Sequence, residues 1–451
     1  MPRDRRARRA AAFHARHPRI KPPMIDVDAL NRRLTLRLIA PFLVLIVLNS
    51  LDRVNIGFAA VRMNADLGLS AQAYGFGVGL FFAGYMLCQV PAMALLQRVG
   101  LRLWITAVVL GWGLVATAMA FVQSEHGFYA LRLLLGVTEA GFAPGVVYTC
   151  TQWMPQRLRA GAIAKTMLAV PISVLMGAPL SGWLMDAVNP LGWPGWRWML
   201  LIEGIPTVLL GLAAWGYFVN KLEDARWLSA AEKRWLREQI DAEQAPASTA
   251  APALGWRALF GKPAFWAAAL TWFGLLAGAY GLIYWLPLVI KEVSQRGNLS
   301  VSLLSALPWV GIAAGMVINA RHSDRTGERH LHVALPSLLA AAGLALAAWA
   351  GASWLALAIL VVGGYGLGAA QGTFWTLPPL FLPAAALPYG IALINMTGNL
   401  AGLVTPPAIG WIKQCTGAYD LPAYLIAAEL MVAAGMVLLL RAQAARRPSS
   451  T

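Results

Sequence analysis

The sequence is short of charge and of cysteine. Only 12% of its 451 residues are Asp, Glu, Lys or Arg, whereas a soluble domain carries about 25%. So small a share does not cover a water-exposed surface of this size, which excludes a soluble globular protein. The three cysteines, Cys88, Cys150 and Cys415, are scattered through apolar segments. Their spacing excludes a disulfide framework and a cysteine metal site.

Catalytic motifs are missing as well. The sequence has no Gly-rich phosphate loop, no cluster of metal-ligand residues and no catalytic triad. We therefore expect no enzymatic activity, no bound metal and no cofactor.

Hydrophobic residues, in contrast, make up 59% of the chain. That share predicts an integral membrane protein whose surface faces the lipid bilayer. The net charge is +16, from 36 Lys and Arg against 20 Asp and Glu. Such an excess occurs in nucleic-acid-binding proteins, but in a membrane protein it arises from cytoplasmic loops rich in Lys and Arg. We expect the lipid bilayer as a partner and no nucleic acid.

The first 34 residues are basic and polar. They begin "MPRDRRARRAAAFHARHPRIK", and no small-residue cleavage site follows. The apolar run after them is too long for a secretory signal peptide. We therefore predict that residues 1–34 form a disordered cytoplasmic arm.

Twelve apolar segments come next, each long enough to span a bilayer, for which about 20 residues suffice. They predict an all-α membrane protein with 12 transmembrane helices. The predicted spans are 35–61, 72–96, 101–122, 127–152, 161–187, 198–219, 264–290, 301–320, 333–350, 354–380, 388–412 and 421–441.

A polar segment, residues 220–262, separates the first six spans from the last six. It contains the mixed-charge stretch "KLEDARWLSAAEKRWLREQIDAEQ", which favours an amphipathic helix, and then "APASTAAPA", which is typical of a flexible linker. We predict an N-terminal six-helix bundle over 35–219 and a cytoplasmic central loop over 220–262. A C-terminal six-helix bundle over 263–441 and a cytoplasmic tail over 442–451 follow.

Basic residues between the spans fall mainly on one side of the membrane. That side carries Arg98, Arg102, Arg157, Arg159, Lys165, the central loop, Arg321, Arg325, Arg329, Arg441, Arg446 and Arg447. The other side carries fewer: Arg62, Arg197, Lys291, Arg296 and Lys413. By the positive-inside rule the first side is cytoplasmic, and both termini lie inside.

The two halves of the chain carry matching motifs. "RVGLR" ends the second span and "RTGER" ends the eighth, 227 residues later. Pro179 in the fifth span and Pro406 in the eleventh are separated by the same 227 residues. Two matches at one offset predict two pseudo-symmetric six-helix bundles. In transporters, such repeats hold a substrate site between them near the bilayer midplane.

Four motifs resemble those of a known family. "DRTGER" after the eighth span resembles the cytoplasmic loop signature of the major facilitator superfamily (MFS). "LDRVNIGFAA", "YALRLLLGVTEAGFAPG" and "WRWMLLIEGIP" resemble its anion:cation symporter family, which includes bacterial tartrate, phthalate, hexuronate and galactonate transporters. The resemblance covers all twelve spans and is strongest over residues 50–230. It implies the MFS fold.

The resemblance also implies a cytoplasmic gate built from two loops. Its residues would be Arg98, Gly100, Arg102, Asp324, Arg325, Gly327 and Arg329. Two positions depart from the family pattern. Gln97 stands where Asp is usual, which would loosen the gate. Ser50 stands where Tyr is common, which would change the substrate shape that the site selects.

Four charged residues lie inside spans of the N-terminal half: Asp52, Arg53, Arg132 and Glu139. A charge at the centre of a membrane helix costs about 2.5–3.5 kcal/mol on insertion scales, so each needs a partner. Successive helix residues point in different directions, so Asp52 and Arg53 do not pair with one another. Arg132 and Glu139 are seven residues apart and share one helix face.

Two interpretations of these charges remain open. In the structural one, Asp52 pairs with Arg132. Glu139 then pairs with Arg53, and the two pairs only neutralise each other. In the functional one, the arginines bind an anionic substrate, because arginine stays charged and grips a carboxylate with two hydrogen bonds. The carboxyls carry protons, because a carboxyl removed from water can change its charge near neutral pH. A charged Asp52 would then compete with the substrate for the arginines.

The family resemblance implies the functional division, with Arg53 on the substrate and with Asp52 and Glu139 on protons. It also implies further substrate-site residues, each with an alternative role in core packing: Tyr85, Trp375 and Asn395. Glu203, in "LIEG", is expected to be structural.

The sequence therefore predicts a secondary active transporter, a monomer in the cytoplasmic membrane of a bacterium. It would import an organic carboxylate with protons by alternating access. The substrate would be a sugar acid, a tartrate-like acid or an aromatic carboxylate, and the proton gradient would supply the energy in place of a cofactor. One alternative is a drug or cation exporter of the same fold, although buried arginines would repel a cation. Another is a membrane sensor on a transporter scaffold that carries nothing.

Overall fold

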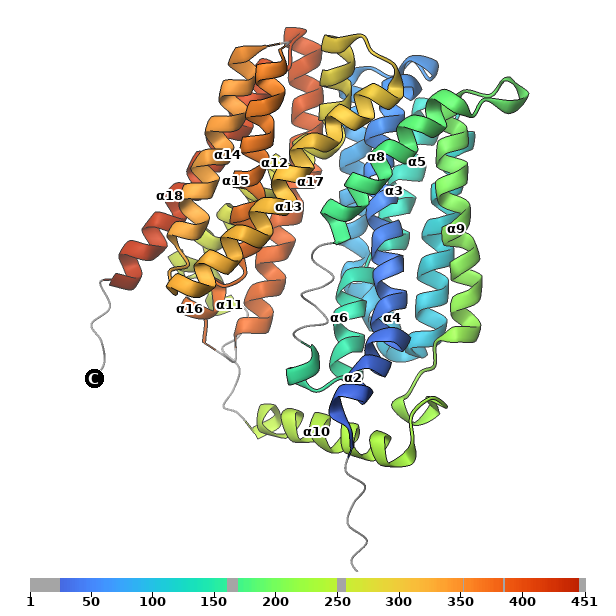
Figure 1. Cartoon of the computed structure of the whole chain (residues 1–451), viewed down its shortest axis with the longest axis vertical. Helices are drawn as coiled ribbons and strands as arrows, with labels where there is room; N and C mark the ends of the chain where they lie inside the picture. Colours follow the sequence, from blue (N-terminus) through green and yellow to red (C-terminus); the bar gives the residue numbers. More distant parts are fainter. Residues whose placement is uncertain (1–24, 160–168, 250–256, 352, 384–385, 446–451) are drawn as a thin grey trace, which may run out of the picture.

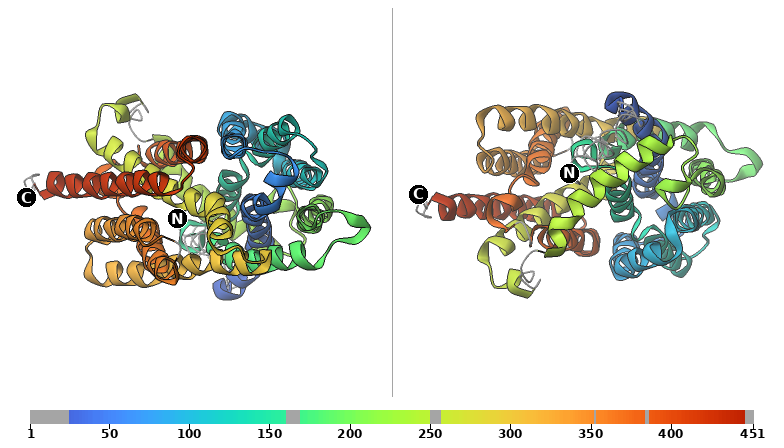
Figure 2. Two further views of the ribbon diagram at one scale, coloured as in Figure 1. Left: turned by 90° about the horizontal axis from the view of Figure 1, so that it is seen from above. Right: turned by 90° about the horizontal axis from the view of Figure 1, so that it is seen from below.

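The computed structural model describes residues 25–159, 169–249, 257–351, 353–383 and 386–445, and helices account for most of them. The long helices stand in two groups side by side, seen along their length in Figure 1 and from both ends in Figure 2. A membrane helix satisfies its backbone hydrogen bonds internally, which is why apolar segments of this length fold as helices in lipid.

The N-terminal group contains the first six predicted spans. Its helices are α2 (Val27–Leu34), the π-helix η1 (Thr35–Ile39), α3 (Ala40–Asp66), α4 (Ala71–Ala118), α5 (Glu125–Glu139), α6 (Phe142–Trp153), α8 (Ala169–Ala187) and α9 (Gly195–Tyr217). Two 3-10 turns, η2 (Met119–Phe121) and η3 (Pro190–Gly192), link α4 to α5 and α8 to α9.

The C-terminal group contains the last six spans. Its helices are α12 (Pro263–Ser294), α13 (Asn298–Thr326), α14 (Leu331–Ala350), α15 (Trp354–Phe374), α16 (Pro378–Phe381), α17 (Leu387–Thr416) and α18 (Asp420–Ala445). Between the groups lie η4 (Leu222–Asp224), α10 (Ala230–Thr249) and α11 (Arg257–Phe260).

The all-α fold with twelve spans is confirmed. Ten helices of the described chain are long and apolar enough to cross a membrane. One of them, α4, contains both the second and the third predicted span, joined at Gly100, whose φ of 80° breaks the helical path. α17 covers the eleventh span. The fourth span is α5 followed by α6, interrupted at Gly141 with φ 84°.

The two groups repeat one plan. Gly100 and Gly327, 227 residues apart, both have a positive φ, 80° and 71°, and each ends a span. Across the boundary α4 packs on α17, and α8 packs on α13. These are the second span with the eleventh and the fifth with the eighth. The 227-residue offset relates the second span to the eighth and the fifth span to the eleventh, so each pairing is the counterpart of the other. Two pseudo-symmetric bundles are expected to pack in this way.

Glycines let the two groups touch at one end. A Cβ on Gly75 of α4 would lie 2.4 Å from the carbonyl oxygen of Pro406, and a Cβ on Gly182 of α8 would lie 2.8 Å from Cα of Leu299. No other residue would allow these backbones so close. We call this the far end, because α10 lies across the opposite end, the α10 end, in the right-hand view of Figure 2.

Hydrogen bonds between the groups also gather toward the far end. Within the described residues they are the bond from the Tyr74 hydroxyl to the carbonyl oxygen of Tyr284, at 3.0 Å, and two bonds that Asp186 accepts from the start of α13. In Figure 1 the groups meet at the top and separate toward α10 at the bottom.

The structure differs from the prediction at two boundaries. Val27–Leu34 form a helix instead of a disordered arm, because Leu30 and Leu34 share one face and are fully buried. Arg33, beside Leu34, pairs with Glu232 of α10. Residues 1–24 of the predicted arm lie outside the described residues. α10 extends to Thr249, so the first part of the predicted linker is helical.

Candidate functional site

Arg53 on α3 forms an ion pair with Glu139 on α5. Arg53 Nε lies 2.7 Å from Glu139 Oε2. The Glu139 side chain is fully buried, whereas that of Arg53 is 24% exposed. No residue of the described chain hydrogen-bonds the two terminal nitrogens of Arg53. That edge of the guanidinium can therefore hold a second anionic group.

Phe81 on α4 lies between the two arginines. The guanidinium carbon of Arg53 is 5.1 Å from the centre of the Phe81 ring, and that of Arg132 is 5.0 Å from it. Tyr85, one turn further along α4, has its ring centre 4.9 Å from Arg53. A cation over an aromatic face gains about 0.5–2 kcal/mol. Three predicted substrate residues, Arg53, Arg132 and Tyr85, therefore gather around one ring.

Arg132 on α5 is the more buried arginine, with 1% exposure. Its Nε and Nη2 atoms have no hydrogen-bond partner in the described chain. Tyr284 of α12 interacts with it from the other half. Asp52 does not pair with it, so only one of the two ion pairs in the structural interpretation is formed. Unpaired N–H groups on a buried cation favour any anion that reaches them.

Asp52 points away from the arginines. Its Oδ2 accepts a hydrogen bond from Trp112 Nε1 at 3.0 Å, and its Oδ1 accepts a longer one from Asn55 at 3.5 Å. The residue is 3% exposed. The expected competition between Asp52 and the substrate is therefore not a direct contact in this structure, because Asp52 and Arg53 face different neighbours of α3.

A chain of aromatic and amide side chains runs through the C-terminal half. Trp375 packs on Trp272 with ring centres 4.8 Å apart, and Trp272 Nε1 donates to Asn395 Oδ1 at 3.4 Å. Asn399 donates to the Asn395 carbonyl oxygen at 3.0 Å. The Tyr280 hydroxyl donates to Asn399 Oδ1 at 3.2 Å. The predicted residues Trp375 and Asn395 thus share one network that ends at Tyr280.

Tyr280 connects this network to the arginines. Its ring centre is 4.6 Å from that of Phe82, which follows Phe81 on α4, and it interacts electrostatically with Arg53. Tyr280 and Phe81 were not among the predicted site residues, although signals for both exist. Tyr280 lies 227 residues after Arg53, which makes it the counterpart of that arginine in the repeat. Phe81 precedes Tyr85 by four residues and so shares its helix face.

The first gate loop, at the α10 end, is tied within the N-terminal half. The backbone N–H of Arg102 donates to Asn220 Oδ1 at 2.9 Å, and its Nε donates to the carbonyl oxygen of Trp215. A Cβ on Gly100 would lie 2.7 Å from Asn220 Oδ1, so glycine is required by space as well as by its positive φ. Arg98 is exposed.

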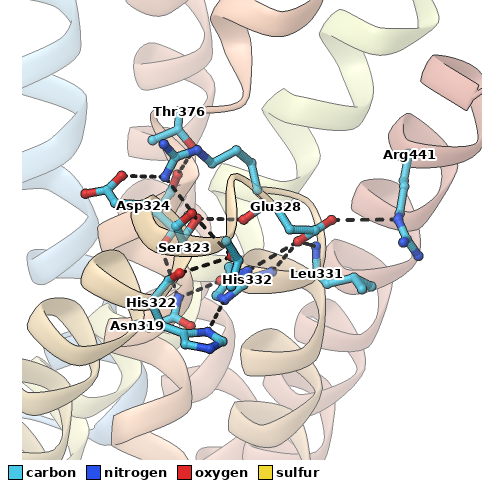
Figure 3. A network of polar contacts seen from close by, with 12 residues as sticks. Asn319, His322, Ser323, Asp324, Glu328, Leu331, His332, Thr376 and Arg441 are labelled. Carbon is cyan, nitrogen blue, oxygen red and sulfur yellow. Dashed lines mark hydrogen bonds and ion pairs between the residues drawn. The ribbon is translucent and has the colours of Figure 1, made fainter.

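The second gate loop is tied within the C-terminal half, as Figure 3 shows. Arg329 Nη1 lies 2.6 Å from Asp324 Oδ1. Glu328 accepts a hydrogen bond from the backbone N–H of Leu331 at 2.7 Å and lies 3.7 Å from Arg441 of α18. Arg325 is exposed. In this conformation each loop is therefore bound to its own group of helices.

A cavity of about 570 Å³ lies elsewhere, within the C-terminal half near the far end. Its walls are mainly apolar and include Trp285, Leu286 and Trp354. It contains none of the predicted substrate residues. The cluster around Phe81 carries the buried cation Arg132 and the partly buried cation Arg53, and we therefore take it as the candidate site for an anion.

Comparisons with known proteins agree with this architecture. Residues 42–406 match the family model of the Major Facilitator Superfamily. A putative tartrate transporter of Agrobacterium vitis is 44% identical over 409 residues, 91% of this chain and 94% of that protein. A quinolone resistance transporter of Acinetobacter baumannii is 36% identical over 90% of this chain and 93% of that protein. The crystal structure of a D-xylose–proton symporter matches with a TM-score of 0.72 at 16% identity, over 90% of this chain and 97% of that chain.

The family match spans most of the chain, and the relatives cover it nearly from end to end. Together with the ten helices of the described chain that are long and apolar enough to cross a membrane, they make the protein an integral membrane transporter whose substrate is a small molecule. They also agree with the motifs that resemble the anion:cation symporters. The chain belongs to the Major Facilitator Superfamily.

Proposed function

We propose that the protein imports an organic carboxylate together with protons by alternating access. The observation that carries the proposal is Arg53, held by Glu139 through Nε alone and placed beside the unpaired N–H groups of Arg132. Two guanidinium groups around one aromatic ring suit a small carboxylate. The relative named as a putative tartrate transporter supports an organic acid as the substrate.

Proton binding and anion binding are linked at Arg53 in this mechanism. An ionised Glu139 occupies the Nε edge of the guanidinium at 2.7 Å. A proton on Glu139 removes its charge and releases Arg53 to the carboxylate of the substrate. When Glu139 loses that proton, the ion pair forms again and displaces the anion. The transporter therefore binds the substrate with a proton and releases both on the other side.

The α10 end faces the cytoplasm in this proposal. It carries Arg102, Arg157 and Arg329 of the predicted cytoplasmic set, which the positive-inside rule places inside. The two halves are joined at the far end, so the described conformation is open toward the cytoplasm. Import requires the far end to open and the two gate loops to meet.

Export of a drug is the second candidate. It is favoured by the relative named as a quinolone resistance transporter, at 36% identity. The two arginines weigh against a cationic drug. A positively charged substrate in this site would lie about 4–6 Å from the guanidinium groups, and they would repel it.

The deciding experiment is flux into proteoliposomes that contain the purified protein. A tartrate-like acid, a sugar acid and an aromatic carboxylate would be offered with an acidic outside, beside a cationic drug. We expect one of the carboxylates to accumulate and a protonophore to abolish its accumulation. Drug efflux without carboxylate uptake would favour the exporter. Binding without flux of any compound would favour a sensor.

A further inference from the structure

Glu203 on α9 is a third buried carboxyl, and the coupling described above does not use it. It is 3% exposed. The Ser181 hydroxyl donates to its Oε1 at 2.7 Å, and its Oε2 has no hydrogen-bond partner in the described chain. A buried carboxylate without a cation is strongly disfavoured. Burial without a cation therefore favours the protonated form of Glu203 in this conformation.

Among the residues that the structure describes, no counter-ion faces Glu203 from the helices around it. α9 packs on α3, α4 and α8. α3 presents Asp52, which interacts electrostatically with Glu139 of α5 and, less strongly, with Glu203. The stretch of α4 over 104–118 has no ionisable residue, and Asp186 of α8 is bonded to α13 at the far end. Arg197, on α9 itself, donates to a backbone carbonyl of η2.

Asn55 lies between Asp52 and Glu203. Its Nδ2 donates to Asp52 Oδ1 at 3.5 Å, and its side chain also interacts with Glu203. Two neighbouring carboxyls without a cation do not both ionise, and they titrate as a pair. Asp52 and Glu203 therefore carry at most one negative charge between them.

The bond between Ser181 and Glu203 lies directly behind the far-end contact of α8. Gly182, the next residue, is where α8 touches Leu299 and Ser302 of α13. The charge on Glu203 decides whether Ser181 donates to a neutral acid or to an anion. A change in that charge therefore acts on α8 one residue away from its contact with α13.

We propose that Glu203 is a further proton-coupling residue, which shares a proton with Asp52 and transmits its charge state through Ser181 to the far-end seal. The proton moves from one carboxyl to the other carboxylate, so no further reactant is needed. The inference rests on the proposed proton-coupled import. It replaces the structural role that the sequence alone suggested for Glu203.

The test compares Glu203→Gln with the wild-type protein and with Glu429→Gln in proteoliposomes. Glutamine keeps the size of Glu203 and one acceptor oxygen for Ser181 but does not ionise. Glu429, on α18, also has an unpartnered buried oxygen, and it is a matched control in the other half. Each coupled proton contributes a factor of about ten in accumulation per pH unit. Maximal accumulation by Glu203→Gln should fall by that factor, while counterflow exchange and Glu429→Gln stay at the wild-type level.

Wild-type accumulation and proton stoichiometry in Glu203→Gln would overturn the proposal and leave Glu203 structural. If the wild type itself shows no proton-driven uptake, the proposed function fails, whatever Glu203 does. If Glu203→Gln does not insert, Ser181→Ala carries the test, because it keeps the carboxyl and removes the link to α8. Ser181→Ala should reduce accumulation while it preserves counterflow, and unchanged accumulation would overturn the role of the link.

Discussion

Asp186 at the end of α8 caps α13 of the other half through Asn298 and the residue that follows it. Asp186 Oδ1 accepts a hydrogen bond from Asn298 Nδ2 at 2.7 Å, and its Oδ2 accepts one from the backbone N–H of Leu299 at 2.8 Å. A carboxylate at a helix N-terminus also interacts favourably with the helix dipole. One side chain therefore caps a helix and joins the two halves at the far end.

Asp186→Ala should weaken the far-end seal. Loss of an N-cap costs about 0.5–2 kcal/mol, a shift of about two- to thirtyfold toward the conformation open at that end. The measurement is the rate at which an impermeant maleimide labels a cysteine at Ser302, after removal of the three natural cysteines. Asp186→Asn is the control, because its carbonyl still accepts from Leu299. Equal labelling in Asp186→Ala and the wild type would show that the cap does not hold the seal.

Arg53→Lys should lose most transport although the protein still inserts. Lysine places one ammonium group where the guanidinium now serves both Glu139 and a substrate carboxylate. Loss of a charged hydrogen bond of about 1.5–3 kcal/mol predicts uptake lowered by about ten- to hundredfold. Arg37→Lys, at an exposed position of η1, is the matched control and should transport normally. Wild-type uptake by Arg53→Lys would remove this arginine from the substrate site.

Glu139→Gln should separate binding from accumulation. In the wild type, rising pH ionises Glu139, strengthens its pair with Arg53 and weakens the apparent affinity for the anion. Glutamine does not compete in this way, so the variant should bind with an affinity that stays nearly constant over about pH 5–8, the range in which a buried carboxyl changes charge. Counterflow should persist and proton-driven accumulation should vanish. Loss of binding together with accumulation would instead support a structural ion pair.

The sequence predicted the twelve spans and the repeat because membrane helices are set by local composition. It also identified the charged residues, because a charge in an apolar span stands out. It did not determine which charges meet, since that depends on how neighbouring helices turn toward each other. Trp112 of α4 turns Asp52 away from Arg132, and Phe81 brings Arg132 and Arg53 together. Trp112 carries no signal of its own among the many aromatic residues of this chain, and Phe81 is marked only by the helix face that it shares with Tyr85.

Glu232 should fix α2 to α10 at neutral pH. Burial raises the pKa of Glu232, but the bonds from Ser229 and the Arg33 guanidinium outweigh it, so the pKa lies below its usual value. A lowered pKa stabilises the contact above the unfolded pKa of about 4.3, and this stabilisation is lost as the pH falls through the folded pKa.

Glu232→Gln should therefore loosen α2 at pH 7. The pair with Arg33 is partly exposed, so the expected loss is about 1 kcal/mol, or about fivefold faster amide exchange over residues 27–34. Hydrogen–deuterium exchange measures this, with Glu238→Gln on the exposed face of α10 as the control. In acid, the exchange rates of the wild type and Glu232→Gln should become equal. A difference in exchange rate that persists in acid would show that the charge of Glu232 is not the cause.

Asp52→Asn should lower accumulation while it keeps pH-dependent binding. From the sequence alone, Asp52 would compete with the substrate for the arginines, and Asp52→Asn would bind with little pH dependence. The structure instead shows Glu139 on Arg53 and Asp52 on Trp112, a bond that asparagine can still accept. Removing one coupled proton lowers maximal accumulation by about tenfold per pH unit, while Glu139 still sets the pH dependence of affinity. Binding and accumulation measured over the same pH range separate the two cases. If Asp52→Asn loses its pH dependence of binding, Asp52 turns toward the arginines in another conformation and competes there directly.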